Sequence, residues 1–347
     1  MQSQNLSRFS KIISHFNNAR ILVVGDIMLD KFMWGSVSRI SPEAPVPVVW
    51  AKSESFMPGG ASNVANNIAA LGAKAYICGI VGDDEAGQTL VSQLNKNSIN
   101  SEGIIVDKSR PTISKTRIIA HHQQVVRIDK ESDHPIDSKS FNKILSFLKK
   151  KVAEVDAVII EDYGKGLIMP NLIKHLISIS KSHKKIIMVD PKQEHLHLYK
   201  GITAITPNHK EAEIASGIRI VNKTSLEKAG KRLLSIWNAD AVLVTLGEDG
   251  MALFKKKGKW VHIPTVAQEV YDVSGAGDTV IAGFTLARIS GANMVEAAHL
   301  SNIAAGIVVG KLGIAVCTPD EIKIRLKRAG RYSKKNKKSS YPSTSIF

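Results

Sequence analysis

Short runs of continuously apolar residues alternate with helical patterns along most of this chain. A strand that is apolar at every position, instead of every second one, is typical of a sheet covered on both faces. The segments between these runs repeat apolar residues at helical spacing. The alternation therefore predicts an α/β fold with a largely parallel sheet. We expect strands at 21–24, 75–81, 157–160, 186–189, 202–206 and 241–245, and helices at 60–71, 138–153, 170–181, 208–216, 224–236, 276–290 and 293–310.

Two segments interrupt this alternation. Residues 38–51 form an extended stretch with three prolines, and because proline cannot donate a ladder hydrogen bond, the stretch can only be an edge or irregular strand. Residues 113–120 and 124–129 predict a second β pair between helices. Together these segments, about 36–52 and 112–129, predict a small sheet that stands off the main one as a lid.

The composition is that of an ordinary globular protein. The 347 residues are 44% apolar and 22% charged, which excludes a disordered or collagen-like chain. No apolar run approaches the roughly 20 residues of a membrane span, and the N-terminus lacks the apolar core of a signal peptide. Cys78 and Cys317 are too few for a disulfide framework or a zinc site. We expect both to be buried thiols, and the protein to be cytoplasmic.

The net charge of +16 is concentrated toward the C-terminus. Nine Lys or Arg and no acid occur from Lys323 to Lys338. Residues 328–347 contain little apolar material, which predicts a basic, disordered tail behind a single domain of residues 1–327. A solubilising tail is the simplest interpretation, and contact with nucleic acid or an anionic membrane is the alternative.

The run DVSGAGDT at 272–279 carries the clearest chemical signal. Two glycines around an alanine let the N–H groups of Gly275, Ala276 and Gly277 turn toward one point at a helix start. With the positive end of the helix dipole, this predicts an anion hole for a phosphoryl group. Asp278 would lie in the first turn, where it could accept a proton. The alternative is a glycine-rich turn with an acid that favours the dipole.

Two further motifs have residue types that suit sugar binding, one at the start of a predicted helix and one after the first predicted strand. Gly59 and Gly60 open a helix and permit close backbone approach, and Asn63 can bind hydroxyl groups. Asp26 and Asp30 follow the first strand, where ligands of α/β proteins bind. Each motif alone could be ordinary turn or cap chemistry.

A fourth motif, TPNHKE, follows the strand at 202–206. Asn208 and Glu211 lie one turn apart at a helix start, a spacing that suits a water-mediated Mg²⁺ shell beside phosphates. A capping box would use the same two residue types.

These four motifs, in this order, resemble the ribokinase-like (PfkB-type) carbohydrate kinases over about residues 20–320. The resemblance implies a three-layer α/β/α sandwich with a mostly parallel central sheet and a small β-sheet lid. The longer runs GDIMLDKFMWGSVSRISPEAPVPVV, PGGASNVANNIAALGA, EDYGKG and QEVYDVSGAGDTV resemble the branch that phosphorylates D-glycero-β-D-manno-heptose 7-phosphate at C1. That branch serves ADP-heptose synthesis for the lipopolysaccharide inner core. It occurs alone or as the kinase half of a bifunctional protein.

The resemblance also implies roles for individual residues. Asp278 would deprotonate the C1 hydroxyl that attacks ATP, and the N–H groups of Gly275, Ala276 and Gly277 would receive the developing charge. Mg²⁺ would be held through water near Asn208 and Glu211, without a direct protein cage, and a monovalent cation such as K⁺ is a further expected ligand. The sugar would contact Asp30, Gly59, Gly60, Asn63, Asp190 and Lys192. The nucleotide would contact Asn208, Glu211, Thr245, Gly247, Gly250 and Asn302.

The 7-phosphate of such a substrate needs a cation. Arg39 is our first choice because it lies in the predicted lid, and Lys165, Lys192, Arg117 and Arg127 are the other candidates. The lid strands resemble those that close a homodimer in this family, so we expect a homodimer. The sequence contains no H-x-G-H motif, so we expect a separate nucleotidyltransferase in the pathway.

Departures from the branch keep alternatives open. Glu161 stands where this branch usually has Ser, and Gln193 follows VDPK in place of Gly. A kinase for another sugar or sugar phosphate is one alternative. An inactive scaffold that binds acidic partners through its basic tail is the other.

Overall fold

A nine-stranded sheet forms the centre of the molecule in the computed structural model, which describes residues 3–121, 123–267 and 269–336. Its strand order is β13-β12-β11-β10-β9-β8-β1-β4-β5. Strands β11 through β5 pair in parallel, and β12 and β13 are antiparallel at one edge. The strands are β1 (Arg20–Gly25), β4 (Lys74–Val81), β5 (Asn100–Val106), β8 (Ala157–Glu161), β9 (Ile186–Asp190), β10 (Ala204–Ile205), β11 (Ala241–Thr245), β12 (Met251–Lys255) and β13 (Val261–Ile263).

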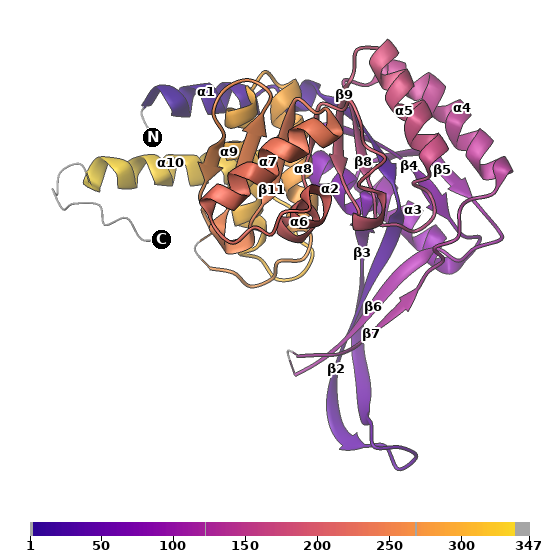
Figure 1. Cartoon of the computed structure of the whole chain (residues 1–347). Coiled ribbons are helices and arrows are strands. Elements are labelled where there is room, and N and C mark those ends of the chain that lie inside the picture. The colour runs from indigo at the N-terminus through magenta and orange to yellow at the C-terminus, as the bar shows by residue number, and fades with distance from the viewer. Residues whose placement is uncertain (1–2, 122, 268, 337–347) are drawn as a thin grey trace.

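Helices cover both faces of this sheet (Figure 1). Alternate residues of β1 enter different cores: Ile21 and Val23 belong to one, Leu22 and Val24 to the other. This follows from the two-residue period of a strand and explains the continuously apolar runs. The first core includes α1 (Ser3–Ile13), α2 (Ala61–Ala70), α3 (Glu85–Lys96), α8 (Ala276–Ile289), α9 (Met294–Val308) and α10 (Pro319–Asn336). The second includes α4 (Ser138–Glu154), α5 (Pro170–Ser182), α6 (His209–Ser216) and α7 (Lys223–Trp237). The predicted α/β fold is confirmed.

A second sheet of four strands projects away from the main body (Figure 1). Its order is β3-β2-β6-β7, built from β2 (Ile27–Ile40), β3 (Pro47–Gly60), β6 (Ile113–Ala120) and β7 (Gln123–Lys130). We call these four strands the lid. The predicted pair 113–120 and 124–129 is confirmed. The predicted single stretch 36–52 was wrong in extent, because it spans the ends of two long strands and the turn between them.

The prolines explain that difference. Pro42 and Pro45 lie in the β2–β3 turn, and Pro47 is the first residue of β3. β3 pairs only with β2 and is therefore an edge strand, where a missing N–H is tolerated. Sequence reasoning located the edge but missed the strand residues before 36 and after 52.

The first part of the segment predicted as a disordered tail, residues 328–347, is helical. α10 continues to Asn336, so residues 328–336 are helical, and residues 337–347 lie outside the described part of the chain. Asp320 and Glu321 in the first turn favour the helix dipole, and Lys and Arg are good helix formers. Both cysteines are buried free thiols, as predicted. Among the described helices, none is both long and apolar enough to cross a membrane.

Candidate active site

Several parallel strands of the central sheet end at one edge with polar residues. β8 ends in Glu161, β9 in Asp190 and β11 in Thr245, and Asp26 directly follows β1. The start of α8 reaches the same edge, because one carboxylate oxygen each of Asp278, Glu161 and Asp190 lies within 4.8 Å of the others. The carboxyl edge of a parallel sheet is the usual ligand site of α/β folds, and most of the predicted site residues meet here.

Asp278 is the best-placed proton acceptor at this edge. It lies in the first turn of α8 and is 5% exposed. Its Oδ2 accepts a hydrogen bond from Nδ2 of Asn63 at 2.6 Å, and its Oδ1 accepts one from the Tyr163 hydroxyl at 3.0 Å. Burial raises the pKa of Asp278 to about 6, and the two hydrogen bonds act in the opposite direction. Such a group is ionised at neutral pH and can take a proton.

Tyr163 is a site residue that the sequence analysis left without a role. It follows β8 within the EDYGKG run, and its N–H donates to Oδ2 of Asp26 at 3.1 Å. Asn63 was expected to bind sugar, and its amide is directed to the base. The position of Tyr163 in the sequence could have indicated a role in the site, because EDYGKG follows a buried strand, as other site motifs do.

The start of α8 has the geometry of an anion hole. Gly275 is its N-cap with φ of 76°, and a Cβ there would lie 2.7 Å from Nδ2 of Asn63, so only glycine fits. The N–H of Ala276 donates to the Val273 carbonyl at 3.2 Å. Within the described residues this leaves the N–H groups of Gly275 and Gly277 as the donors that an incoming anion can use.

Two acids lie beside the base. Glu161 and Asp190 are register partners on neighbouring strands, and Oδ1 of Asp190 accepts from the Thr206 hydroxyl at 2.7 Å. Burial, reinforced by Asp190 and Asp278, raises the pKa of Glu161 well above its usual range. Burial likewise raises the pKa of Asp190 to about 8. The predicted sugar contact Asp190 is thus surrounded by other acids.

The predicted nucleotide residues also meet. Asn208 forms an isolated parallel bridge with Thr245, which brings the start of α6 beside the end of β11. Asn208 and Glu211 form a complete capping box: Oδ1 of Asn208 accepts from the Glu211 N–H, and Oε2 of Glu211 accepts from the Asn208 N–H. Burial raises the pKa of Glu211. The cap uses one carboxylate oxygen, so the residues fit a water-mediated Mg²⁺ shell as well.

Three other nucleotide candidates shape the loops around β11. Gly247 and Gly250 have φ of 62° and 85° and frame the short turn after Thr245. Asn302 is 4% exposed and its Nδ2 donates to the Pro264 carbonyl at 2.8 Å. Its amide therefore fixes the loop after β13, and a direct contact with the nucleotide stays a prediction.

The sugar side of the site is formed by β2 and β3. Asp30 on β2 is 3% exposed, and Oδ1 accepts a charge-assisted hydrogen bond from Arg117 on β6. A Cβ on Gly59 would collide with the Asp30 carboxylate, so glycine is required at this close approach. Gly60 has φ of 53° and is the N-cap of α2. Burial raises the pKa of Asp30, and Arg117 acts against that rise.

Asp26 has a structural role, in keeping with the turn or cap chemistry that the sequence analysis left open for it. It is 2% exposed, and its two oxygens accept backbone hydrogen bonds from Tyr163, Lys165 and Leu167 at 3.1–3.3 Å. Asp26 therefore fastens the loop after β8 to the end of β1. Burial raises its pKa, and these backbone donors act against the rise.

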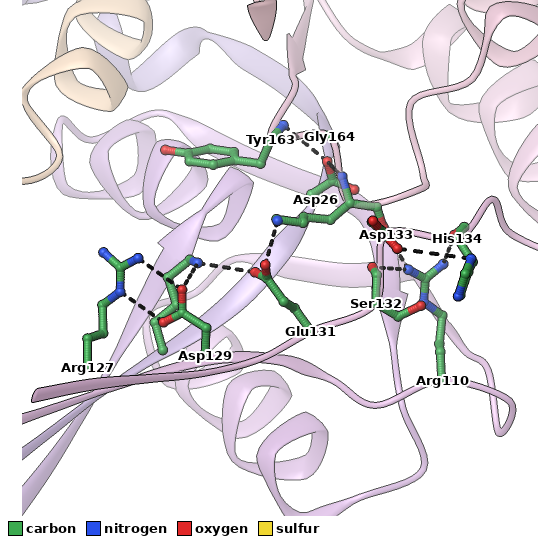
Figure 2. A network of polar contacts seen from close by, with 12 residues as sticks. Asp26, Arg110, Arg127, Asp129, Glu131, Ser132, Asp133, His134, Tyr163 and Gly164 are labelled. Atoms are coloured by element: carbon green, nitrogen blue, oxygen red, sulfur yellow. Dashed lines mark hydrogen bonds and ion pairs between the residues drawn. The ribbon is translucent and has the colours of Figure 1, made fainter. Parts of the chain in front are cut away.

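An ionic network connects this loop to the lid (Figure 2). Lys165 donates to Oε1 of Glu131 at 2.6 Å, and Lys115 contacts both Glu131 and Asp129 at 3.2 and 3.1 Å. Arg127 completes the row with two hydrogen bonds to Asp129. Basic side chains from β6, β7 and the site loop are thus gathered beside Asp30.

The structure does not bring every predicted cation to the site. Arg39 is exposed near the far end of β2, nine residues from Asp30, which is roughly 30 Å of strand. It cannot contact a sugar held by Asp30 of the same chain. Lys192 is half-buried near the site, where it lowers the pKa of Glu211 and passes beside Gly164.

Comparison with known proteins agrees with the fold and the site together. The pfkB family of carbohydrate kinases matches residues 18–321, and the chain belongs to this family. The chain is 45% identical to the bifunctional protein HldE of Desulfatibacillum aliphaticivorans over 326 residues, covering 94% of this chain and 66% of that protein. It is 49% identical to HldE of Helicobacter hepaticus over 304 residues, covering 87% of this chain and 63% of that protein. The chain thus spans slightly less than two thirds of these relatives.

Solved structures confirm the ribokinase-like fold. Arabidopsis thaliana ribokinase complexed with ribose and ATP aligns with a TM-score of 0.70 and 20% identity, covering 89% of this chain and 99% of that one. Escherichia coli phosphofructokinase-2 in complex with substrates and products aligns with a TM-score of 0.74 and 19% identity, covering 90% and 100%.

Proposed function

We propose that this chain is an ATP-dependent kinase that phosphorylates D-glycero-β-D-manno-heptose 7-phosphate at C1. The product is the 1,7-bisphosphate, an intermediate of ADP-heptose synthesis. One observation carries the proposal: a buried carboxylate with a pKa of about 6 lies beside free N–H groups at a helix start, in a chain 45–49% identical to two HldE proteins. The proposal covers kinase chemistry alone, since this chain spans part of those relatives.

The reaction follows from the groups at this edge. The C1 hydroxyl gives its proton to Asp278 while the hydroxyl oxygen forms a bond to the γ-phosphorus of ATP. The bond from that phosphorus to the β–γ bridging oxygen breaks, and ADP leaves with the electron pair. The N–H groups of Gly275 and Gly277 face the charge on the transferred group. Asn63 and Tyr163 hold the two oxygens of the base in place.

The nucleotide would lie along Thr245, Gly247, Gly250 and Asn208, whose elements adjoin the base. Mg²⁺, when bound, neutralises charge on the phosphates. Asn208 and Glu211 would hold it through water, because the capping box occupies part of their oxygens. A monovalent cation such as K⁺ is part of the proposal and is tested by replacing K⁺ with tetramethylammonium in the assay.

The 7-phosphate is assigned to the basic side chains that flank Asp30. Arg117, Lys115 and Arg127 all act on the Asp30 carboxyl; the first two come from β6, which pairs with β2, and Arg127 comes from β7, which pairs with β6. Lys165 joins the same network through Glu131. An arginine–phosphate contact is worth about 1.5–3 kcal/mol, enough to select a sugar phosphate over a free sugar.

The remaining parts of the proposal concern the protein's surroundings. We propose a homodimer closed by the lids, a cytoplasmic location where ATP is available, and a separate nucleotidyltransferase that consumes the product. The lid exposes large apolar side chains, including Trp50 at 73%, which suits burial against a second copy.

The test is ATP-dependent phosphorylation of a substrate panel: heptose 7-phosphate, sedoheptulose 7-phosphate, ribose and fructose 6-phosphate. Strong preference for the heptose phosphate, lost in Asp278→Asn, is the expected result. Activity on another sugar would keep the mechanism and reject the heptose assignment. A folded protein with no activity on any of them would reject the kinase proposal.

A further inference from the structure

A groove outside the candidate active site lies between α7 and the hairpin of β12 and β13. Its volume of about 850 Å³ is within the range that is usual for small-molecule sites, about 300–1,000 Å³. The turn of this hairpin lies at the amino edge of the sheet, because Lys255 pairs with Ala241, the first residue of β11. Thr245, on the nucleotide side, is the last residue of β11 and is about 13 Å of strand away. The hairpin end of the groove is therefore separate from the candidate active site.

Lysine side chains line both walls of this groove. Lys223 and Lys231 come from α7, and Lys255, Lys256 and Lys259 come from the hairpin. Glu227 is the one acid among the lining residues, and its carboxylate is already paired with Lys231 at 2.7 Å. Lys256 is paired at 3.3 Å with Asp240, which does not line the groove. The charge on two of the lysines is thus compensated within the protein.

The other three lysines have no carboxylate partner. Within residues 3–121, 123–267 and 269–336, the side chains of Lys255 and Lys259 form no ion pair or hydrogen bond. Lys223 lies over the ring of Trp260, with its Nζ 5.6 Å from the ring centroid, and likewise has no ion pair in the described part of the chain. Ammonium groups gathered at one place repel one another unless an anion lies between them. The groove therefore carries positive charge that the described residues do not neutralise.

Trp260 anchors the lysine-bearing hairpin to the core. Its ring stacks on Phe254, with the ring centroids 5.4 Å apart and the ring planes 19° apart. Phe254 is 1% exposed and belongs to the core that α7 covers. The backbone positions of Lys255 and Lys259 beside α7 are therefore maintained without a ligand.

We propose that this groove binds a phosphorylated polyanion, a small molecule with at least three negative charges on linked phosphoryl groups. Lysine ammonium groups are common phosphate ligands, and cations on opposite walls contact different phosphoryl groups of one molecule. None of the large apolar side chains that the described residues expose lines the groove. This favours a small anion over a protein segment, whose binding relies on apolar anchors. The inference goes beyond the proposed function, because it requires neither the sugar nor phosphoryl transfer.

The experiment measures binding of inorganic tripolyphosphate to the full chain by isothermal titration calorimetry, without nucleotide, sugar or divalent metal. We expect a binding event that is weakened at least tenfold in Lys255→Gln/Lys259→Gln. The matched control, Lys143→Gln/Lys149→Gln, removes two exposed lysines of α4 and should leave the affinity unchanged. The start of α8 is altered in neither variant, so the comparison isolates the groove. A thermal melt of each variant without ligand establishes that it is folded.

Two further titrations define the ligand. Orthophosphate should bind the groove at least tenfold more weakly than tripolyphosphate, because it contacts fewer of the lysines. ATP, titrated in the same way, distinguishes two sources of the phosphoryl groups. If the binding that is lost in Lys255→Gln/Lys259→Gln is tighter for ATP than for tripolyphosphate, the ligand is a nucleoside polyphosphate. If that binding is weaker for ATP, the ligand is an inorganic polyphosphate.

Two outcomes would overturn the inference. If tripolyphosphate does not bind, or binds the wild type and folded Lys255→Gln/Lys259→Gln equally, the hairpin lysines serve only to keep the edge strand β13 from pairing with other chains. If a poly-glutamate peptide binds at least tenfold more tightly than tripolyphosphate and loses that binding in the same variant, the groove is a site for an acidic protein segment. Because the readout is anion binding, a failure of the substrate panel alone would leave this result intact.

Discussion

The catalytic edge and the lid are both built from strands, but their surroundings differ. β1 and β8 are buried between two helical layers, and the acids at their ends and at the start of α8 are almost inaccessible: Asp26, Glu161 and Asp278 are each at most 5% exposed. Strand β7 of the lid is exposed at all eight positions. Burial at the edge raises carboxyl pKa values and fixes geometry. The lid instead presents cations and apolar side chains. This difference in burial suits the carboxyl edge of the central sheet to the chemical step and the lid to substrate recognition.

The largest effect is expected from Asp278→Asn. The amide keeps the size of the side chain and cannot accept the hydroxyl proton, so kcat should fall about 10²- to 10⁴-fold with little change in thermal stability. Steady-state kinetics and a thermal melt measure the two quantities. Asp272→Asn, six residues earlier in the loop that leads into α8, serves as the matched control. A kcat within threefold of wild type would remove Asp278 from the mechanism.

Asp26→Ala should damage the fold where Asp278→Asn does not. Removing the carboxylate leaves three backbone N–H groups of the loop after β8, two part-buried and one buried, without an acceptor, which should cost roughly 3 kcal/mol of unfolding free energy. Urea unfolding measures the loss. Asp133→Ala, on the exposed segment between β7 and α4, should change the unfolding free energy by less than about 0.5 kcal/mol. Equal stability of both variants would contradict the anchoring role.

On the lid side, Arg117→Met tests recognition. The apolar stem is retained while the guanidinium that bonds Asp30 is lost. The KM for the sugar phosphate should rise about 10- to 100-fold with a smaller change in kcat, because the contact is made in ground state and transition state alike. Arg39→Met, at the far end of the same sheet, is the control and should leave the KM unchanged. It is measured on monomeric protein, where no second lid can bring Arg39 to the site. A loss confined to kcat would place Arg117 in the chemistry instead.

The pH dependence of the edge is a smaller effect with a definite sign. Asp278 must be ionised to act as a base, so kcat should be constant above its pKa of about 6 and fall tenfold per unit below it. Tyr163→Phe removes a hydrogen bond that favours the ionised form. The midpoint should therefore move to higher pH in that variant. A midpoint that stays fixed or moves lower would show that Tyr163 does not act on the base.

Features of the fold and site that depend on residues close together in the sequence could be predicted, and those that depend on contacts between distant residues could not. The central strands and the GAGD helix start were predicted because continuous apolar runs and glycine spacing are local signals. The sequence could not decide the role of Asp26, because its donors, Tyr163, Lys165 and Leu167, lie more than 130 residues away in the sequence. The distance of Arg39 from Asp30 of the same chain was missed for a related reason. The distance between Arg39 and Asp30 depends on the length of β2. That length was underestimated because the prolines of the following turn indicated an irregular segment.

The smallest expected effect on stability lies at the lid surface. Trp50 is 73% exposed on β3, so Trp50→Ser removes no contact of the folded core and should change Tm by less than a few degrees. If two lids pack on each other, the same substitution removes apolar area that the dimer buries, so dimerisation measured by sedimentation equilibrium should be weaker. Val221→Ser, 66% exposed between α6 and α7, removes a comparable surface residue away from the lid. It should leave the dimer intact. A wild-type chain that sediments as a monomer at micromolar concentration would reject the dimer, and the lid would then recognise substrate alone.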